Sequence, residues 1–358
     1  MLQMLLVGTL AMSGAQSAPH GALRAGWEAI QRGEADEAAA AFRRALAADG
    51  RDPSALAGAG AAAHLLGRDD EAIRFLKRAL DVEPEFAYAA HLLGQLAYAQ
   101  GDLDLAIKSY ERVIKVSPGS PRVYQQLQAW KQEAALHDGF VSRPGVRFSV
   151  LFEGPAQEAI AARVSRVLEA SYLRVGRALN AYPSQTITAI LYTKQQFRDI
   201  TKAPDWAAGA YDGRIRIPVL GALRAPGELD RVVTHEFVHA LIASIAPRGV
   251  PAWLNEGLAT YFEPAGHGWV QERLRAAPAL IPLAALEESF TGLSGVDPTL
   301  AYAESLVAAQ LLVERLGPNF PVFLQYVGNG TSLEQALLLF NITPADIERE
   351  WTRRTRAR

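Results

Sequence analysis

The apolar and small residues of positions 21–118 recur with a period of 34. Small residues let two helices approach closely, whereas glycine and proline end helices. The pattern therefore predicts three copies of a helix-turn-helix unit. We expect residues 122–136 to form one more helix that caps the third copy. The recurring positions are Gly26, Gly60 and Gly94; Gly33, Gly67 and Gly101; Ala38, Ala72 and Ala106; Phe42, Leu76 and Tyr110; Ala45, Ala79 and Val113; and Gly50, Pro84 and Pro118.

These positions resemble the tetratricopeptide repeat, although the first copy has Gly50 where the family usually has proline. The resemblance implies an N-terminal α-solenoid of three repeats. We expect such a stack to bind a protein partner or a substrate segment in its concave groove.

The helical pattern ends in a stretch rich in glycine and proline, which predicts a linker at 138–145. The predicted organisation is a repeat domain with its capping helix at 19–137, then this linker, then a second domain at 146–358. The second domain is expected to be α+β and mostly helical.

Alternating hydrophobicity in the second domain predicts strands at 146–154, 186–193 and 213–219, with a long helix at 155–179. Pro218 cannot donate a ladder hydrogen bond, so the segment 213–219 is predicted to be an edge strand. The expected result is a small mixed sheet covered on one face. The edge strand could pair with an extended peptide, or its Arg214 and Arg216 could form a solvated face.

The net charge of -2 argues against a general attraction to nucleic acid or anionic lipid. The chain has no cysteine, so any metal must be held by His, Asp or Glu.

An apolar run from Leu2 to Met12 precedes Ser13 and Ala15, which are spaced like a signal-peptidase site. We expect a signal peptide at 1–18 and an exported protein, periplasmic or secreted. Because no Lys or Arg precedes the run, the segment could instead stay uncleaved and hold the protein at a membrane. It is shorter than the roughly 20 apolar residues that a spanning helix needs, so no stable transmembrane span is expected.

The predicted helix at 226–245 is apolar on almost every face, yet it contains His235, Glu236 and His239. A spacing of four places both imidazoles on one face, where they can reach a single ion. A zinc ion would satisfy these polar groups, and Glu236 would act as the base that deprotonates an attacking water. The alternative is a histidine pair that only makes hydrogen bonds in the core.

Glu256 is the candidate for the third metal ligand, 17 positions after His239. It lies near the start of an apolar segment, 252–263, that follows a turn containing Pro and Gly. Two helices joined by a short turn pack antiparallel, which would bring Glu256 towards His239. The prediction is one zinc ion held by two histidines and a glutamate, with a fourth position open for water.

The motifs HEFVH and NEGLA resemble the gluzincins, the thermolysin-like metallopeptidases whose third zinc ligand is a glutamate in a following helix. The phrases GRIRIP, AYAESLVAAQLLVERLG and SLEQALLLFNITPADIEREW extend the resemblance to peptidase-MA-like domains over 146–358. Such enzymes commonly have a side chain that stabilises the oxyanion, and Tyr302 is the position we assign to it. Tyr261 and Ser305 are rivals, and Glu263 is either a partner of the metal ligands or a surface charge.

The predicted function is zinc-dependent hydrolysis of peptide bonds in protein or peptide substrates. One alternative is a non-catalytic scaffold or assembly factor with an inactive metallopeptidase-like domain. Another is a purely structural zinc site.

Overall fold

The computed structural model describes residues 18–183, 185–202, 209–220, 226–264, 266–287, 290 and 297–356. The chain forms two compact units, Met1–Leu93 and Gly94–Arg358. The predicted signal peptide, 1–18, lies outside the described residues except for Ala18. Among the described helices, none combines the length and the apolarity that crossing a membrane requires.

The first unit consists of paired helices, as the repeat pattern predicts. Each pair closes around a glycine: a Cβ atom at Gly26 would lie 2.7 Å from the ring of Phe42, and one at Gly60 would lie 2.9 Å from Leu76. Gly33 has a φ of +74°, the left-handed conformation that lets the chain turn into the second helix. The helices are α1 (Ala18–Arg32), α2 (Ala35–Ala48), α3 (Pro53–Leu65), α4 (Asp69–Val82) and the start of α5 (Ala87–Ala99).

The second unit begins inside α5 and continues with α6 (Leu103–Val116) and α7 (Pro121–His137). The same contact recurs here, because a Cβ at Gly94 would lie 2.5 Å from the ring of Tyr110. Trp130 of α7 covers this pair, with ring centroids 4.3 Å from Tyr110 and 4.7 Å from Tyr98. The helix predicted at 122–136 is therefore present, and it covers the aromatic rings of the third repeat.

A five-stranded mixed sheet follows, with the order β1-β2-β3-β5-β4. Strand β2 is parallel to β3 and β3 is parallel to β5, whereas the two outer strands are antiparallel to their neighbours. The strands are β1 (Val141–Arg143), β2 (Phe148–Phe152), β3 (Ile187–Thr193), β4 (Ala210–Tyr211) and β5 (Ile215–Leu220). Strand β1 lies within the stretch predicted as a linker, whereas the boundaries of the domains stay a prediction.

The prediction of an edge strand at 213–219 was wrong. Strand β5 lies between β3 and β4, and the edge strand is the two-residue β4. Because β4 pairs only with Ile215 and Arg216, Pro218 lies beyond this pairing, and on its other side it is opposite Tyr192 of β3. The proline therefore marks the part of β5 that β4 does not reach.

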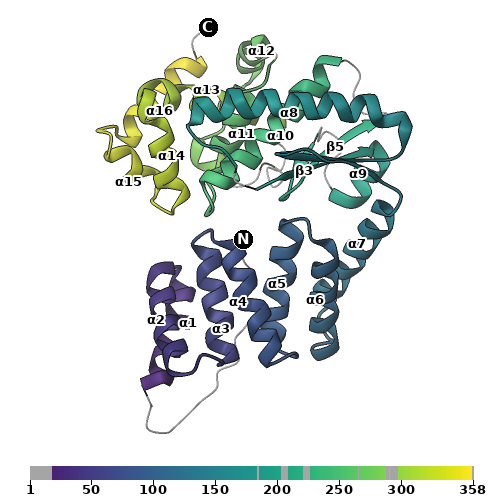
Figure 1. Cartoon of the computed structure of the whole chain (residues 1–358). Helices are drawn as coiled ribbons and strands as arrows, with labels where there is room; N and C mark the ends of the chain where they lie inside the picture. Colours follow the sequence, from purple (N-terminus) through teal and green to yellow (C-terminus); the bar gives the residue numbers. More distant parts are fainter. Residues whose placement is uncertain are drawn as a thin grey trace. The chain divides into compact units, whose positions relative to one another are not determined.

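Both faces of the sheet are covered, which corrects the expectation of one covered face. Helices α8 (Glu158–Leu179) and α10 (Pro226–Ile245) share one core with Ile215 and Ile217. On the other face, α9 (Lys194–Thr201) packs Phe197 against Tyr192. Figure 1 shows α8 and α9 on opposite sides of β3 and β5.

The remaining helices complete the core around α13 (Pro298–Leu316), which is buried along most of its length. Helix α11 (Ala252–Tyr261) approaches it at Gly257, where a Cβ would lie 2.2 Å from the backbone oxygen of Ser305. The site helix predicted at 226–245 has the predicted bounds in α10. The other helices are α12 (Gly268–Ala276), α14 (Phe320–Gly328), α15 (Leu333–Leu338) and α16 (Pro344–Arg356).

A carboxylate, Glu304, is fully buried within α13. Its two oxygens accept the backbone N–H of Ile281 at 3.0 and 3.2 Å. Burial raises the pKa of Glu304 to about 7, and the hydrogen bond from Ile281 only partly opposes this shift. The folded protein therefore holds a proton on this group at a pH at which the unfolded chain has lost it.

This shift predicts a pH dependence of stability that Glu304→Gln removes. A raised carboxyl pKa contributes stability that is fully present below about pH 4.5 and is lost as the pH rises through about 7. The amide cannot titrate, so the variant should gain roughly 1–3 kcal/mol in unfolding free energy relative to wild type between pH 5 and pH 8. Urea unfolding at both pH values measures this gain. Glu272→Gln, at an exposed position, is the matched control. If Glu304→Gln differs from wild type in unfolding free energy by the same amount at both pH values, the raised pKa of Glu304 is contradicted.

Candidate active site

Three metal-ligating side chains predicted from the sequence meet in one place. Helix α10 places His235 and His239 one turn apart, with ring centroids 4.8 Å from each other. Helix α11 brings the Oε2 atom of Glu256 to 3.3 Å from His235 Nε2 and to 3.5 Å from His239 Nε2. The candidate ligand atoms all lie within 4.8 Å of one another.

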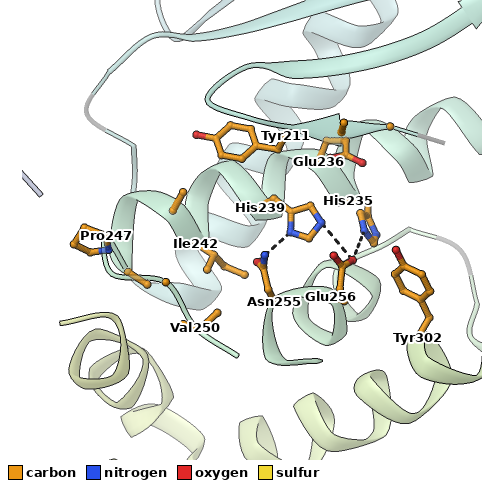
Figure 2. A pocket seen from close by; sticks show the side chains of 15 residues that line it. Tyr211, His235, Glu236, His239, Ile242, Pro247, Val250, Asn255, Glu256 and Tyr302 are labelled. Carbon is orange, nitrogen blue, oxygen red and sulfur yellow. Dashed lines mark hydrogen bonds and ion pairs between the residues drawn. The ribbon is translucent and has the colours of Figure 1, made fainter. Parts of the chain in front are cut away.

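Each imidazole is held by a second residue through its other nitrogen. His235 Nδ1 lies 2.8 Å from Glu263 Oε1, and His239 Nδ1 lies 3.0 Å from Asn255 Oδ1. Both partner atoms only accept hydrogen bonds, so Nδ1 carries the proton in each ring. Both Nε2 atoms therefore direct their lone pairs towards Glu256, as the dashed lines of Figure 2 show.

This arrangement needs positive charge at its centre, because two lone pairs and a carboxylate oxygen face one another. Burial alone lowers the pKa of His235, but hydrogen bonds to Glu256 and Glu263 overcome this and raise it to about 10. Burial opposes the ionised form of Glu256, yet the neighbouring His239 and His235 lower the pKa of this carboxyl. The protein thus stabilises either a proton or a cation between these groups.

The donor set fits a zinc ion. Ligands about 2.0–2.1 Å from a tetrahedral ion lie roughly 3.3–3.5 Å from one another. The two distances between imidazole nitrogen and carboxylate oxygen, 3.3 and 3.5 Å, fall in this range. Two neutral imidazoles and one carboxylate are also the ligand types of catalytic zinc sites that keep a fourth position open.

Glu236 lies beside this ligand set and is only 5% exposed. Burial raises the pKa of its carboxyl. The backbone of Gly209 lies directly against it, since a Cβ at this glycine would be 2.5 Å from Glu236 Oε1. The absence of a side chain at 209 is therefore a condition for the position of Glu236. Neither the motif nor any periodicity of the sequence indicated this contact.

Tyr302, on α13, lines the same cavity as Glu236 and Glu256. Its ring centroid is 6.2 Å from that of His235, and Figure 2 shows its hydroxyl pointing towards Glu256. Burial, together with the charges of Glu256 and Glu236, raises the pKa of Tyr302, so the phenol stays protonated and can donate a hydrogen bond. The rivals Tyr261 and Ser305 do not line this cavity.

The cavity has a volume of about 420 Å³ and two chemically different ends. The polar end contains the ligand set, Glu236 and Tyr302. The other end is mostly apolar and is formed by Ile242, Ala243, Ala246, Pro247 and Val250. Residues 209–211, which include the edge strand β4, form a further wall. The cavity can therefore hold a polar group at the ligands and an apolar side chain next to it.

Two residues that contact the histidines, Asn255 and Glu263, have roles that the sequence did not indicate or left open. Asn255, noted only as a polar residue in an apolar helix, holds His239. Glu263, for which a surface charge was the alternative, is buried to 5% side-chain exposure and contacts both His235 and Arg231, the latter at 3.1 Å. The seven-residue spacing from Glu256 was the signal for Glu263.

Comparisons with known proteins find separate matches for the N-terminal helical repeats and for the region that contains the candidate site. Models of the tetratricopeptide repeat match residues 29–96 and 87–120, which supports the repeat prediction. No curated protein sequence matches the chain.

Solved structures match over about a third of the chain. A crystal structure of MamA has 26% identity and a TM-score of 0.32, and covers 34% of this chain and 70% of that one. The first tetratricopeptide domain of human RPAP3 has 24% identity and a TM-score of 0.31, with coverage of 33% and 95%. A first tetratricopeptide domain of Spaghetti (RPAP3), bound to an HSP90 peptide, has 22% identity and a TM-score of 0.32, with coverage of 33% and 96%.

The family model that describes the peptidase MA superfamily matches residues 170–355, which is more than half of the chain. The matched region contains α10, α11 and α13, the three helices that supply the ligand set, Glu236 and Tyr302. With this domain following tetratricopeptide repeats, the chain belongs to the peptidase MA superfamily.

Proposed function

We propose that the chain is a zinc-dependent peptidase that hydrolyses peptide bonds in protein or peptide substrates. The observation that carries the proposal is the convergence of two imidazole nitrogens and one carboxylate oxygen in a cavity that also contains Glu236. His235, His239 and Glu256 would hold the ion. When bound, zinc supplies Lewis-acid chemistry, which activates a water molecule and polarises the carbonyl group of the substrate.

The protein's own residues perform the proton transfers and the positioning. Glu236 accepts a proton from the attacking water and passes it to the nitrogen of the leaving amine. Tyr302 donates a hydrogen bond to the oxygen that gains negative charge as the carbonyl is attacked. The apolar end of the cavity receives an apolar substrate side chain next to the bond that is cleaved.

The repeats are proposed to bind a protein partner or a segment of the substrate, as expected for a stack of tetratricopeptide repeats. We further propose, from the apolar segment at 2–12, that the enzyme acts after export. Both proposals extend the peptidase activity and neither is needed for the chemistry of the site.

Glu236→Gln should abolish cleavage while the metal remains bound. The amide cannot accept the proton, so cleavage of a mixed peptide library should fall by roughly 10²–10⁴-fold. Mass spectrometry of the library measures cleavage, and elemental analysis should give one zinc per chain for both proteins. Glu272→Gln, on the exposed side of α12, should retain wild-type activity. A wild-type protein that binds one zinc but cleaves no peptide would support the non-catalytic scaffold instead.

Tyr302→Phe should lower kcat and leave KM and the zinc content unchanged, because the hydroxyl acts on charge that exists only in the transition state. Loss of one such donor reduces kcat by roughly 10²–10³-fold. Steady-state kinetics on a peptide from the library measures both constants. Tyr261→Phe is the matched control, since Tyr261 lies outside the cavity lining. A kcat that falls for Tyr261→Phe and not for Tyr302→Phe would assign the role to the rival.

Glu263→Ala should weaken zinc binding, because His235 would lose the acceptor that orients its ring. Removing such a partner lowers metal affinity about 10–100-fold. Competition with a chromophoric chelator measures the affinity. The control is the same substitution at an exposed position, Glu272→Ala. Unchanged affinity in Glu263→Ala would show that its contact with His235 does not support the metal site.

A further inference from the structure

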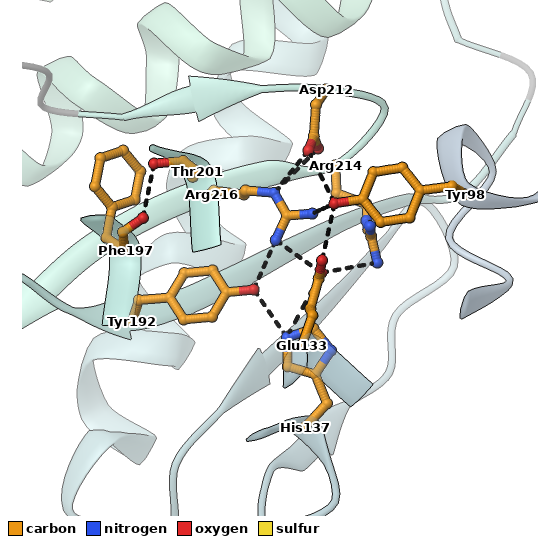
Figure 3. A network of polar contacts seen from close by, with 9 residues as sticks. All are labelled: Tyr98, Glu133, His137, Tyr192, Phe197, Thr201, Asp212, Arg214 and Arg216. Carbon is orange, nitrogen blue, oxygen red and sulfur yellow. Dashed lines mark hydrogen bonds and ion pairs between the residues drawn. The ribbon is translucent and has the colours of Figure 1, made fainter. Parts of the chain in front are cut away.

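A second buried polar cluster lies on the face of the sheet opposite the active-site helix. It contains two buried cations, Arg214 and Arg216, which are 3% and 0% exposed, and two anions, the buried Glu133 and the exposed Asp212. Of the two alternatives for this segment, the solvated face for the two arginines is wrong, because α7 and α9 cover this side of the sheet. Figure 3 shows the cluster, which also includes Tyr98, Tyr192 and His137.

Arg216 is the centre of the cluster. Its Nε atom donates to the two Asp212 oxygens at 3.1 and 3.0 Å, and its Nη2 donates to the hydroxyl of Tyr98 at 2.9 Å. Its Nη1 lies 2.9 Å from Glu133 Oε1 and donates to the hydroxyl of Tyr192 at 2.7 Å. Strand β5 is thereby bound to two helices of the repeat region, α5 and α7, through one guanidinium.

Tyr98, in the last turn of α5, connects both sides of this arrangement. Its hydroxyl accepts from Arg216 and donates to Glu133 Oε2 at 2.8 Å, with Asp212 Oδ2 at 3.5 Å. The guanidinium of Arg214 lies over its ring, 4.3 Å from the centroid. The end of α5 therefore contacts the β4–β5 turn through one phenol.

The other half of the cluster, Tyr192 and His137, makes no such contact with the turn. The Tyr192 hydroxyl, which accepts from Arg216, lies 2.8 Å from His137 Nε2. Burial lowers the pKa of His137 to about 4, so this histidine is neutral at physiological pH and its Nε2 can accept the phenol proton. Tyr192 thus joins β3 to α7.

The β4–β5 turn is also fixed by its backbone. Gly213 has a φ of +98°, and a Cβ at this position would lie 2.1 Å from the backbone oxygen of Ala99. Only glycine permits this contact between the turn and the end of α5. The ladder then aligns Ala210 of β4 with Arg216 and Tyr211 with Ile215.

Strand β4 lies between this cluster and the catalytic carboxylate. Gly209, Ala210 and Tyr211 line the active-site cavity, and the backbone of Gly209 lies against Glu236. Among the described strands β4 is the last of the sheet on this side, and an extended peptide could add to the backbone groups of its outer edge. A shift of β4 would therefore move both a wall of the cavity and the contact with Glu236.

We propose that Tyr98, Asp212 and Arg216 are positioning residues that hold β4 at the distance from Glu236 at which it can align an extended peptide over the metal ligands. The effect of these three residues on substrates rests on the proposed peptidase function, whereas their effect on the position of β4 does not. Paired charges that are largely buried add little net stability compared with apolar packing, and we infer that this set serves to specify one geometry. That geometry is the position of the β4–β5 turn, and therefore of β4, relative to the end of α5.

Tyr98→Phe and Tyr192→Phe form a matched pair, because each removes one buried hydroxyl that accepts from Arg216. Only the first also removes the hydrogen bond from α5 to Asp212 of the turn, while the backbone contact between Gly213 and Ala99 stays in both variants. Hydrogen exchange of residues 209–213, followed by mass spectrometry in the full chain, reports on β4 directly. Tyr98→Phe and Asp212→Ala should increase exchange there at least tenfold, whereas Tyr192→Phe should leave it unchanged, with α10 protected in all three.

Kinetics on an eight-residue peptide gives the second measurement. Tyr98→Phe should raise KM about tenfold and lower kcat by a smaller factor, because β4 aligns the peptide and Gly209 also contacts Glu236, while Tyr192→Phe should change neither. Equal effects of both tyrosine variants on exchange and KM, or losses of kcat in proportion to a lower Tm, would overturn the proposal and leave a purely structural cluster. If wild type cleaves no peptide, the peptidase proposal fails, and the exchange of 209–213 alone decides whether the cluster positions β4.

Discussion

Two imidazole lone pairs and one carboxylate oxygen face each other in a half-buried site, and much of the second unit is arranged to make this possible. Such a convergence is unfavourable unless a proton or a cation lies between the groups. Helix α10 is apolar on almost every face, so it must be surrounded by other elements, and α8, the sheet and α11 surround it. Burial in turn lowers the effective dielectric constant, which strengthens the interactions of Glu263 and Asn255 with the two rings. The same apolar surroundings that make the polar residues costly also make their geometry definite.

The position of the proposed third ligand depends on a close contact between helices rather than on polar chemistry. Helix α11 carries Glu256, and its position is set where Gly257 meets the backbone of α13 at Ser305. A larger residue at 257 would separate the two helices. Because α11 carries Glu256 and α13 carries Tyr302, these two side chains would then move apart. Gly257 therefore sets the distance between the proposed metal ligand Glu256 and the proposed oxyanion donor Tyr302. In the motif NEGLA, the asparagine, glutamate and glycine each perform a separate physical task.

Features that depend on local periodicity could be predicted from the sequence alone. The bounds of α10 and the repeat pattern follow from spacing, and the approach of Glu256 to His239 follows from two helices joined by a short turn. The edge strand was misplaced because β4 has only two residues, too few for any alternation to be visible. Alternation also showed that Arg214 and Arg216 share one face of β5, but not that α7 and α9 cover that face. Contacts between residues far apart in the chain, such as Tyr98 with Arg216 and Gly209 with Glu236, leave no periodic signal.

The charges on the second face join the end of the repeats to the unit that contains the candidate active site, Gly94–Arg358. Arg214 and Arg216 are 3% and 0% exposed, so their charges need partners from the elements around them as well as from Asp212. Glu133 of α7 supplies one of them, and Tyr98 of α5 supplies the hydroxyl that joins it to Arg216. A sheet without these helices would leave two guanidinium groups facing an uncovered surface, with only Asp212 as a partner. The end of the third repeat and its capping helix thus complete the electrostatics of the sheet, and the sheet carries the wall of the active site.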